Sequence, residues 1–132
     1  RQGCFPAGAV LVKGEKIIAK NISSTDPKIN FHAESKTIDQ AINQLNEQLS
    51  GCTLYSSMEP CLMCLSRAYW SGIRRIVYAV KKSSVSYELC YESNLDQLEI
   101  AAKFNHEINL IYIEELLEEP LRLVLKWQEE NA

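Results

Sequence analysis

Two apolar runs near the start of the chain predict a β-hairpin. Residues 8–12 (GAVLV) and 16–21 (KIIAKN) have the character of strands, and the intervening KGE supplies a glycine for a tight turn. Residues 23–30 are rich in Ser, Asp and Pro and are predicted to form a loop. We therefore expect the chain to open with two antiparallel strands.

From His32 onward the spacing of apolar positions becomes that of a helix. Apolar residues recur every three or four positions as far as Leu49, and Gly51 is expected to end this amphipathic helix. Pro60 is expected to open a second helix, which Gly72 closes. The elements predicted after Gly51 are a strand at 52–58, a helix at 61–71, a strand at 74–80, a loop at 81–93, a helix at 94–104, a strand at 108–113 and a helix at 114–130.

The resulting order, β-β-α-β-α-β-α-β-α, predicts an α/β fold. Strands that alternate with helices are joined by right-handed crossovers and form a mostly parallel sheet, so only the opening hairpin is expected to be antiparallel. We predict a three-layer α/β/α sandwich around a five-stranded mixed sheet, formed as a single domain over residues 1–132.

Length, charge and cysteine content exclude few functions. The chain has 132 residues, 46% of them hydrophobic, so it can bury a core, and no apolar run is long enough to cross a membrane. Its five cysteines fit a reducing compartment better than a disulfide scaffold, and we expect a cytoplasmic protein. The net charge of −3 argues against non-specific binding of nucleic acid. A local basic stretch leaves that question open: Arg74, Arg75, Lys81 and Lys82.

The strongest candidate chemistry lies at the starts of the first two predicted helices. Cys61 and Cys64 are three residues apart in a first helical turn, so both thiols face one side, where the helix dipole lowers their pKa. His32 begins the preceding helix. Both helices follow strands of the same direction, so both start at the same edge of the sheet. The pattern predicts a metal site with His32, Cys61 and Cys64 as ligands.

Each of these residues also has a simpler interpretation when taken alone. His32 could cap its helix or pack in the core, and Glu34 could be a favourable charge in a first turn. The two cysteines could form a redox pair or be buried structural thiols. We favour the metal site because it accounts for matched positions on two successive helix starts.

Three protein ligands leave the fourth position of a tetrahedral Zn²⁺ open, as in catalytic sites. A zinc ion in such a site makes water acidic enough to react near neutral pH, and a nearby carboxylate is then needed to move protons. Glu34 lies two residues beyond His32 and is not needed as a ligand, so it is the candidate catalytic residue.

The pattern H-x-E…P-C-x-x-C at residues 32–64 resembles the signature of the zinc deaminases of the cytidine deaminase-like superfamily. The resemblance implies one Zn²⁺ per chain and an activated water that attacks a carbon bearing an amino group. Glu34 would carry the proton to the ring and then to departing ammonia. It further implies that Asn21 and the backbone N–H of Ala33 bind the base.

Within that superfamily, the EPCLMC block at residues 59–64 is most similar to guanine deaminases and tRNA adenosine deaminases. Tyr69, Trp70 and the acidic balance favour guanine deaminase, although both aromatics could instead be core residues. The resemblance implies an acidic residue after the fourth strand that binds guanine. Glu88 and Glu92 are the candidates, and we prefer Glu92 although a surface glutamate is the simpler reading.

The tRNA adenosine deaminase alternative gains from the basic stretch at residues 74–82, which could contact phosphates. Members of the superfamily are usually homodimers, and we expect one here, formed by an exposed apolar helix face around Leu62, Leu65 and Tyr69. Members also begin with a helix before the first strand. Residues 1–6 cannot supply it, so it is trimmed, disordered or absent.

Two function classes other than deaminase remain. A non-catalytic zinc-binding module would need a fourth ligand, for which Cys52 or Cys90 is available. A redox protein would need Cys61 and Cys64 to oxidise reversibly, which bound zinc prevents.

Overall fold

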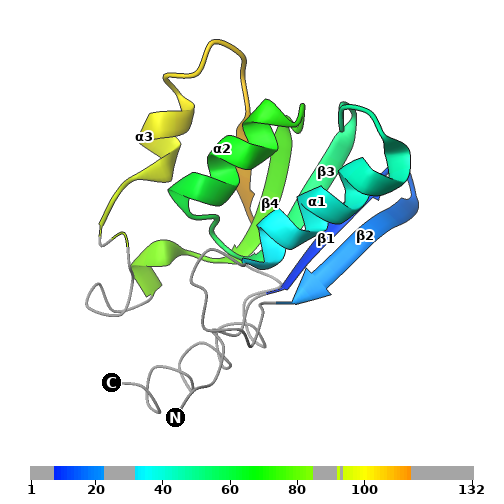
Figure 1. Ribbon diagram of the computed structural model, residues 1–132. Helices are drawn as coiled ribbons and strands as arrows, with labels where there is room; N and C mark the ends of the chain where they lie inside the picture. Colours follow the sequence, from blue (N-terminus) through cyan, green and yellow to red (C-terminus); the bar gives the residue numbers. More distant parts are fainter. Residues whose placement is uncertain (1–7, 23–31, 85–91, 93, 114–132) are drawn as a thin grey trace.

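The structure, a computed structural model, describes residues 8–22, 32–84, 92 and 94–113. Within them the order of elements follows the prediction, with a short 3₁₀ helix added after the fourth strand (Figure 1). The elements are β1 (Gly8–Lys13), β2 (Lys16–Ile22), α1 (Ala33–Leu45), β3 (Cys52–Met58), α2 (Leu62–Trp70), β4 (Arg75–Val80), η1 (Lys82–Ser84), α3 (Gln97–Ala101) and β5 (Asn109–Tyr112).

The five strands form one mixed sheet in the order β2-β1-β3-β4-β5, as expected for this α/β fold. β3, β4 and β5 pair in parallel, and β1 pairs antiparallel with β2. The prediction that only this hairpin is antiparallel is wrong, because β1 is also antiparallel to β3. The connection through α1 passes over β1, so β2 and β3 run in one direction and β1, between them, runs in the other.

Helices α1 and α2 lie side by side on one face of the sheet (Figure 1). Alternating residues of the strands point toward them and form the core. Leu11, Leu54 and Ile76 of the sheet pack with Ile38 and Leu65 of the helices, all with no exposed surface. The helix predicted at 114–130 lies outside the described residues.

Helix α1 ends earlier than the sequence predicts. Asn46 has a φ of 53° and its backbone N–H bonds to the Ile42 carbonyl at 2.7 Å, which caps the helix. Asparagine tolerates this left-handed conformation better than other residues with a side chain. The prediction that Gly51 ends the helix is therefore wrong. Gly51, with a φ of 80°, lies in the turn before β3, and Leu49 is buried outside the helix.

The apolar face predicted for dimer formation is exposed only in part, because Leu62 and Tyr69 are half-buried. Leu65 is completely buried, and the Tyr69 ring lies 4.3 Å from the Phe104 ring, between α2 and the segment after α3. Trp70, in contrast, is 82% exposed and is no core residue. The homodimer stays a prediction of the resemblance alone.

None of the helices among the described residues is both long enough and apolar enough to span a membrane.

Candidate metal centre

The three predicted ligands come from the starts of α1 and α2. His32 is the N-cap residue of α1, with extended backbone angles and no capping bond from its side chain. Cys61 is the N-cap of α2, and its sulfur accepts the Cys64 backbone N–H at 3.4 Å. β2 and β3 run in the same direction, so both helices begin at the same edge of the sheet. His32 is thereby brought close to Cys61 and Cys64, which lie about thirty residues further along the chain.

The ligand atoms have the spacing of a zinc site. His32 Nδ1 lies 3.3 Å from Cys61 Sγ and 3.6 Å from Cys64 Sγ, and all three ligand atoms lie within 4.8 Å of one another. Zn–S bonds of about 2.3 Å and Zn–N bonds of about 2.0–2.1 Å in a tetrahedron separate neighbouring ligand atoms by roughly 3.5–3.8 Å. The three side chains therefore fit zinc with little movement.

The pKa values of the two thiols are shifted in opposite directions. The hydrogen bond from Cys64, together with His32 and the Cys64 backbone amide, lowers the pKa of Cys61 to about 4 against the opposing effect of burial. The same hydrogen bond with Cys61, followed by burial, raises the pKa of Cys64. A divalent cation bound by both sulfurs as thiolates would displace any proton that remains on the pair.

A serine that the sequence analysis did not single out contacts one candidate ligand. The buried Ser35 Oγ lies 3.3 Å from Cys64 Sγ, at hydrogen-bonding distance for a sulfur acceptor. Groups that bond to metal ligands fix the orientation of those ligands and tune their basicity. A lone serine in a helical pattern carries no signal of this role, so only its position beside Cys64 reveals it.

Glu34 lies two residues beyond His32, and it is not among the three side chains whose ligand atoms converge. It is 5% exposed, and its Oε2 lies 2.8 Å from the Ser56 hydroxyl of β3. Burial raises the pKa of Glu34, and the bonds from its own backbone amide and Ser56 oppose this only in part. A buried glutamate with a raised pKa has the property needed for general acid–base chemistry.

Of the predicted base-binding residues, Asn21 lies at the end of β2 and faces α1. Its side-chain nitrogen donates to Gln40 Oε1 at 2.8 Å and to Thr37 Oγ1 at 3.5 Å. Ala33 is the first residue of α1 and is completely buried. A role of either residue in binding a base stays a prediction.

Glu92, preferred as the guanine-binding residue, contacts the start of α2. Both of its carboxylate oxygens accept the Leu62 backbone N–H, at 3.0 and 2.9 Å, and Gln97 Nε2 donates to Oε1 at 2.9 Å. Glu88, the other candidate, lies outside the described residues. The substrate role of Glu92 stays a prediction, and the structure adds an anchoring contact that the sequence did not indicate.

A fourth cysteine ligand is not found near the three in the described part of the chain. Cys52 begins β3 and Cys61 follows its far end, so the seven residues of the strand separate them by about 20 Å. Cys90 lies outside the described residues. Among the described residues, the group therefore offers three protein ligands, as a catalytic zinc site does.

Three of the four residues of the predicted basic stretch are engaged within the protein. The Arg74 guanidinium lies 4.4 Å from the centre of the Tyr69 ring, and Lys81 Nζ lies 4.5 Å from that of Tyr112. Lys82 Nζ donates to the Leu95 carbonyl at 2.8 Å. Arg75 and Lys81 are nevertheless exposed, so phosphate contacts remain open to both.

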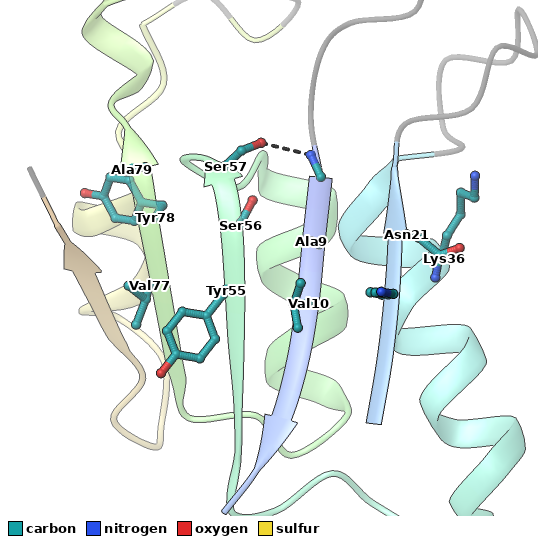
Figure 2. A pocket seen from close by; sticks show the side chains of 12 residues that line it. Ala9, Val10, Asn21, Lys36, Tyr55, Ser56, Ser57, Val77, Tyr78 and Ala79 are labelled. Atoms are coloured by element: carbon teal, nitrogen blue, oxygen red, sulfur yellow. Dashed lines mark hydrogen bonds between the residues drawn. The ribbon is translucent and has the colours of Figure 1, made fainter. Parts of the chain in front are cut away.

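A hollow on the sheet contains none of the three candidate ligands. It spans β2 to β4, and the side chains of Val10, Tyr55 and Val77 lie along the strands that form it (Figure 2). The metal-ligand group belongs instead to the edge where α1 and α2 begin.

The family model that matches this chain describes deaminases, and three of its relatives are deaminases. Residues 1–80 match the model described as the cytidine and deoxycytidylate deaminase zinc-binding region. A probable cytosine deaminase of Schizosaccharomyces pombe is 30% identical over 124 residues, which cover 86% of this chain and 75% of that protein. A tRNA-specific adenosine deaminase of Bacillus subtilis is 36% identical over 115 residues, covering 83% and 68%. The Bacillus subtilis guanine deaminase is 40% identical over 86 residues, covering 61% of this chain and only 54% of the relative.

Solved structures share the fold. A deaminase that carries out A-to-I editing at the wobble position of transfer RNA superimposes with a TM-score of 0.65 at 26% identity, covering 81% of this chain and 82% of the other. The five-stranded mixed sheet with its helices is thus the fold of the deaminases that the sequence pattern resembles.

Proposed function

Because the chain belongs to the cytidine and deoxycytidylate deaminase zinc-binding family, a family of zinc-type hydrolytic deaminases, we propose that it deaminates a purine base and that the base is guanine. The reaction would replace the exocyclic amino group by an oxygen from water and release ammonia. The observation that carries this proposal is the convergence of His32, Cys61 and Cys64, with the buried Glu34 two residues beyond the first of them.

His32 Nδ1 and the two thiolates would hold the zinc ion, which supplies an activated water when bound. Glu34 would accept the proton that the attacking water loses and give it to the ring nitrogen. It would next take the second proton from the hydroxyl group now bonded to the ring carbon and give it to the amino group, which leaves as ammonia as the carbon–oxygen double bond forms. The burial that raises the pKa of Glu34 favours its neutral form, so the side chain can serve as acid as well as base.

Three observations support guanine over an adenosine in tRNA. The guanine deaminase of Bacillus subtilis has 40% identity to this chain over the matched residues. Lys82 contacts the Leu95 carbonyl and Glu92, and Arg74 stacks on Tyr69, so these two cations are less available to a phosphate backbone. The net charge of −3 points the same way.

The second candidate is a tRNA-specific adenosine deaminase. It is favoured by a relative of that name which is 36% identical and matched over 68% of its length, more than the guanine deaminase. One relative therefore favours a free base as the substrate, and the other favours an adenosine within tRNA.

The test is ammonia release from guanine, cytosine, cytidine, adenosine and tRNA by protein purified without chelators, with zinc measured in the same sample. We expect about one zinc per chain and release from guanine. Inosine formed in tRNA without release from guanine would establish the second candidate. Full zinc with no release from any compound would instead support a non-catalytic zinc-binding module.

A further inference from the structure

The hydroxyl of Ser56 lies between two oxygen atoms. Ser56 is on β3 and 5% exposed, and its Oγ lies 2.8 Å from Glu34 Oε2 and 2.7 Å from the Met58 carbonyl oxygen. A serine hydroxyl has one hydrogen to donate and lone pairs that accept, whereas a backbone carbonyl can only accept. The single hydrogen can therefore serve one of the two oxygens at a time.

This arrangement can satisfy Glu34 in either protonation state. When Glu34 is a carboxylate, the Ser56 hydroxyl donates to it. When Glu34 is a carboxylic acid, it donates to Ser56 Oγ, and the Ser56 hydrogen turns to the Met58 carbonyl. The heavy atoms need not move between these states, because only the hydroxyl hydrogen rotates. The carboxyl group therefore keeps Ser56 as a hydrogen-bond partner in both states. A buried polar group without such a partner would cost free energy.

We propose that Ser56 is the positioning residue for Glu34: its hydroxyl, held between Glu34 Oε2 and the Met58 carbonyl oxygen, keeps the carboxyl group in one place. The inference rests on the proposed deaminase function. Ser56 forms no covalent bond and gains or loses no net proton. Each proton moves between the attacking water, Glu34, the ring nitrogen and the departing ammonia.

The chain offers a matched control in the next residue. Ser57 is also on β3, and its hydroxyl oxygen accepts the Gly8 backbone N–H at 2.9 Å at the start of β1 (Figure 2). Successive residues of a strand point to opposite faces, so Ser57 cannot take the place of Ser56 beside Glu34. The substitutions Ser56→Ala and Ser57→Ala remove the same atom from the same strand.

The first measurement is steady-state kinetics on whichever compound of the panel releases ammonia fastest. For Ser56→Ala we expect kcat to fall about tenfold to a hundredfold, with KM and zinc content unchanged. Ser57→Ala should stay within about twofold of the unmodified protein. Ser56→Thr restores the hydroxyl and should recover most of the rate. A purely structural role would lower stability without this division between kcat and KM.

The second measurement needs no substrate. The infrared carboxyl band of Glu34 is assigned by its absence in Glu34→Gln. We expect Ser56→Ala to shift this band, because the carboxyl group loses a hydrogen-bond partner, and Ser57→Ala to leave it unchanged. Should Ser56→Ala fail to fold, Ser56→Cys keeps nearly the same volume with a weaker hydrogen-bonding group, and the same shift and rate loss are expected in smaller measure.

An unshifted band together with a kcat within twofold would overturn the proposal. If the unmodified protein releases no ammonia from any compound, the proposed function fails by itself, and the infrared comparison still decides whether Ser56 holds Glu34. A shifted band with an unchanged kcat would also overturn the proposal, since the contact would then have no effect on the rate.

Discussion

Glu92 accepts the backbone N–H of Leu62 on both carboxylate oxygens, at 3.0 and 2.9 Å. Leu62 is the first residue of α2, so a negative charge meets the positive end of the helix that contains Cys64. Lys82 Nζ, 3.6 Å from Glu92 Oε1, and the Gln97 amide hold the carboxylate there. Glu92 could anchor this helix, bind guanine, or do both, and an experiment can separate these two roles.

The substitution Glu92→Gln should lower the free energy of unfolding by about 1–2 kcal/mol, because it removes the charge from the bond to the helix start. Urea denaturation measures this. The control is Glu99→Gln on α3, since Glu99 is exposed and pairs with Lys103 at 4.0 Å, and it should change stability by less than about 0.5 kcal/mol. An increase in KM for guanine with no loss of stability would instead assign Glu92 to the substrate.

Removal of one ligand thiol should remove the metal. Cys61→Ala is expected to lose both the zinc and the activity, because two protein ligands hold the ion too weakly. Metal analysis after dialysis measures the loss. Cys52→Ala is the control, since this buried cysteine lies at the other end of β3 and should keep about one zinc per chain. Retention of full zinc by Cys61→Ala would contradict the proposed ligand set.

Glu34→Gln should keep the zinc and lose the reaction. The amide has the size of the carboxyl group but cannot carry a proton to the ring or to the leaving ammonia. General acid–base help is worth about 10²–10⁴ in rate, and we expect the upper end because one residue acts at several steps. Turnover close to that of the unmodified protein, at full zinc, would refute this role. Loss of zinc would instead mean that the variant is no test of it.

The same variant should be more stable than the unmodified protein at neutral pH once the metal is stripped from both. Burial raises the folded-state pKa of Glu34 above the value of 4.5 it has when unfolded. The stability that the neutral acid provides is thus complete below pH 4.5 and is lost as the pH rises through the folded pKa. Gln stays neutral, so the advantage of the variant should grow with pH. Chemical denaturation from pH 5 to pH 8 measures it, and parallel stability curves would contradict the prediction.

Ser35→Ala should weaken zinc binding without abolishing it. The hydroxyl of Ser35 contacts Cys64 Sγ, and loss of such a partner typically costs about 10–100-fold in metal affinity. Competition with a chelating dye measures the affinity. Ser66→Ala, on the same helix as Cys64, serves as the control and should bind zinc like the unmodified protein. Equal affinity in both variants would mean that the Ser35 contact does not tune the site.

Much of the site could be predicted from local sequence. Cys61 and Cys64 share a helix face by spacing alone, Pro60 marks where that helix begins, and His32 stands where the apolar period changes. The order of strands and helices then implies that both helix starts meet at one edge of the sheet. These inferences succeed because they depend on contacts within a turn or on the direction of successive elements.

Other features depended on which residues meet across the sheet. The pairing of β1 with β3 follows from where α1 crosses, and Asn46 rather than Gly51 ends α1. Leu65 looked available for a partner and is completely buried. In each case the local pattern admitted more than one arrangement, and packing selected one.

The sequence by itself determined the candidate ligand types, their spacing and the α/β fold that presents them. Only the tertiary structure decided that Ser35 lies beside Cys64, that Ser56 lies beside Glu34, and that Glu92 bonds to the start of α2. Serine and glutamate are common at polar positions, so their sequence context does not reveal a partner. A hydrogen bond needs its atoms within about 3 Å, and between residues distant in sequence that proximity exists only once the strands and helices have packed.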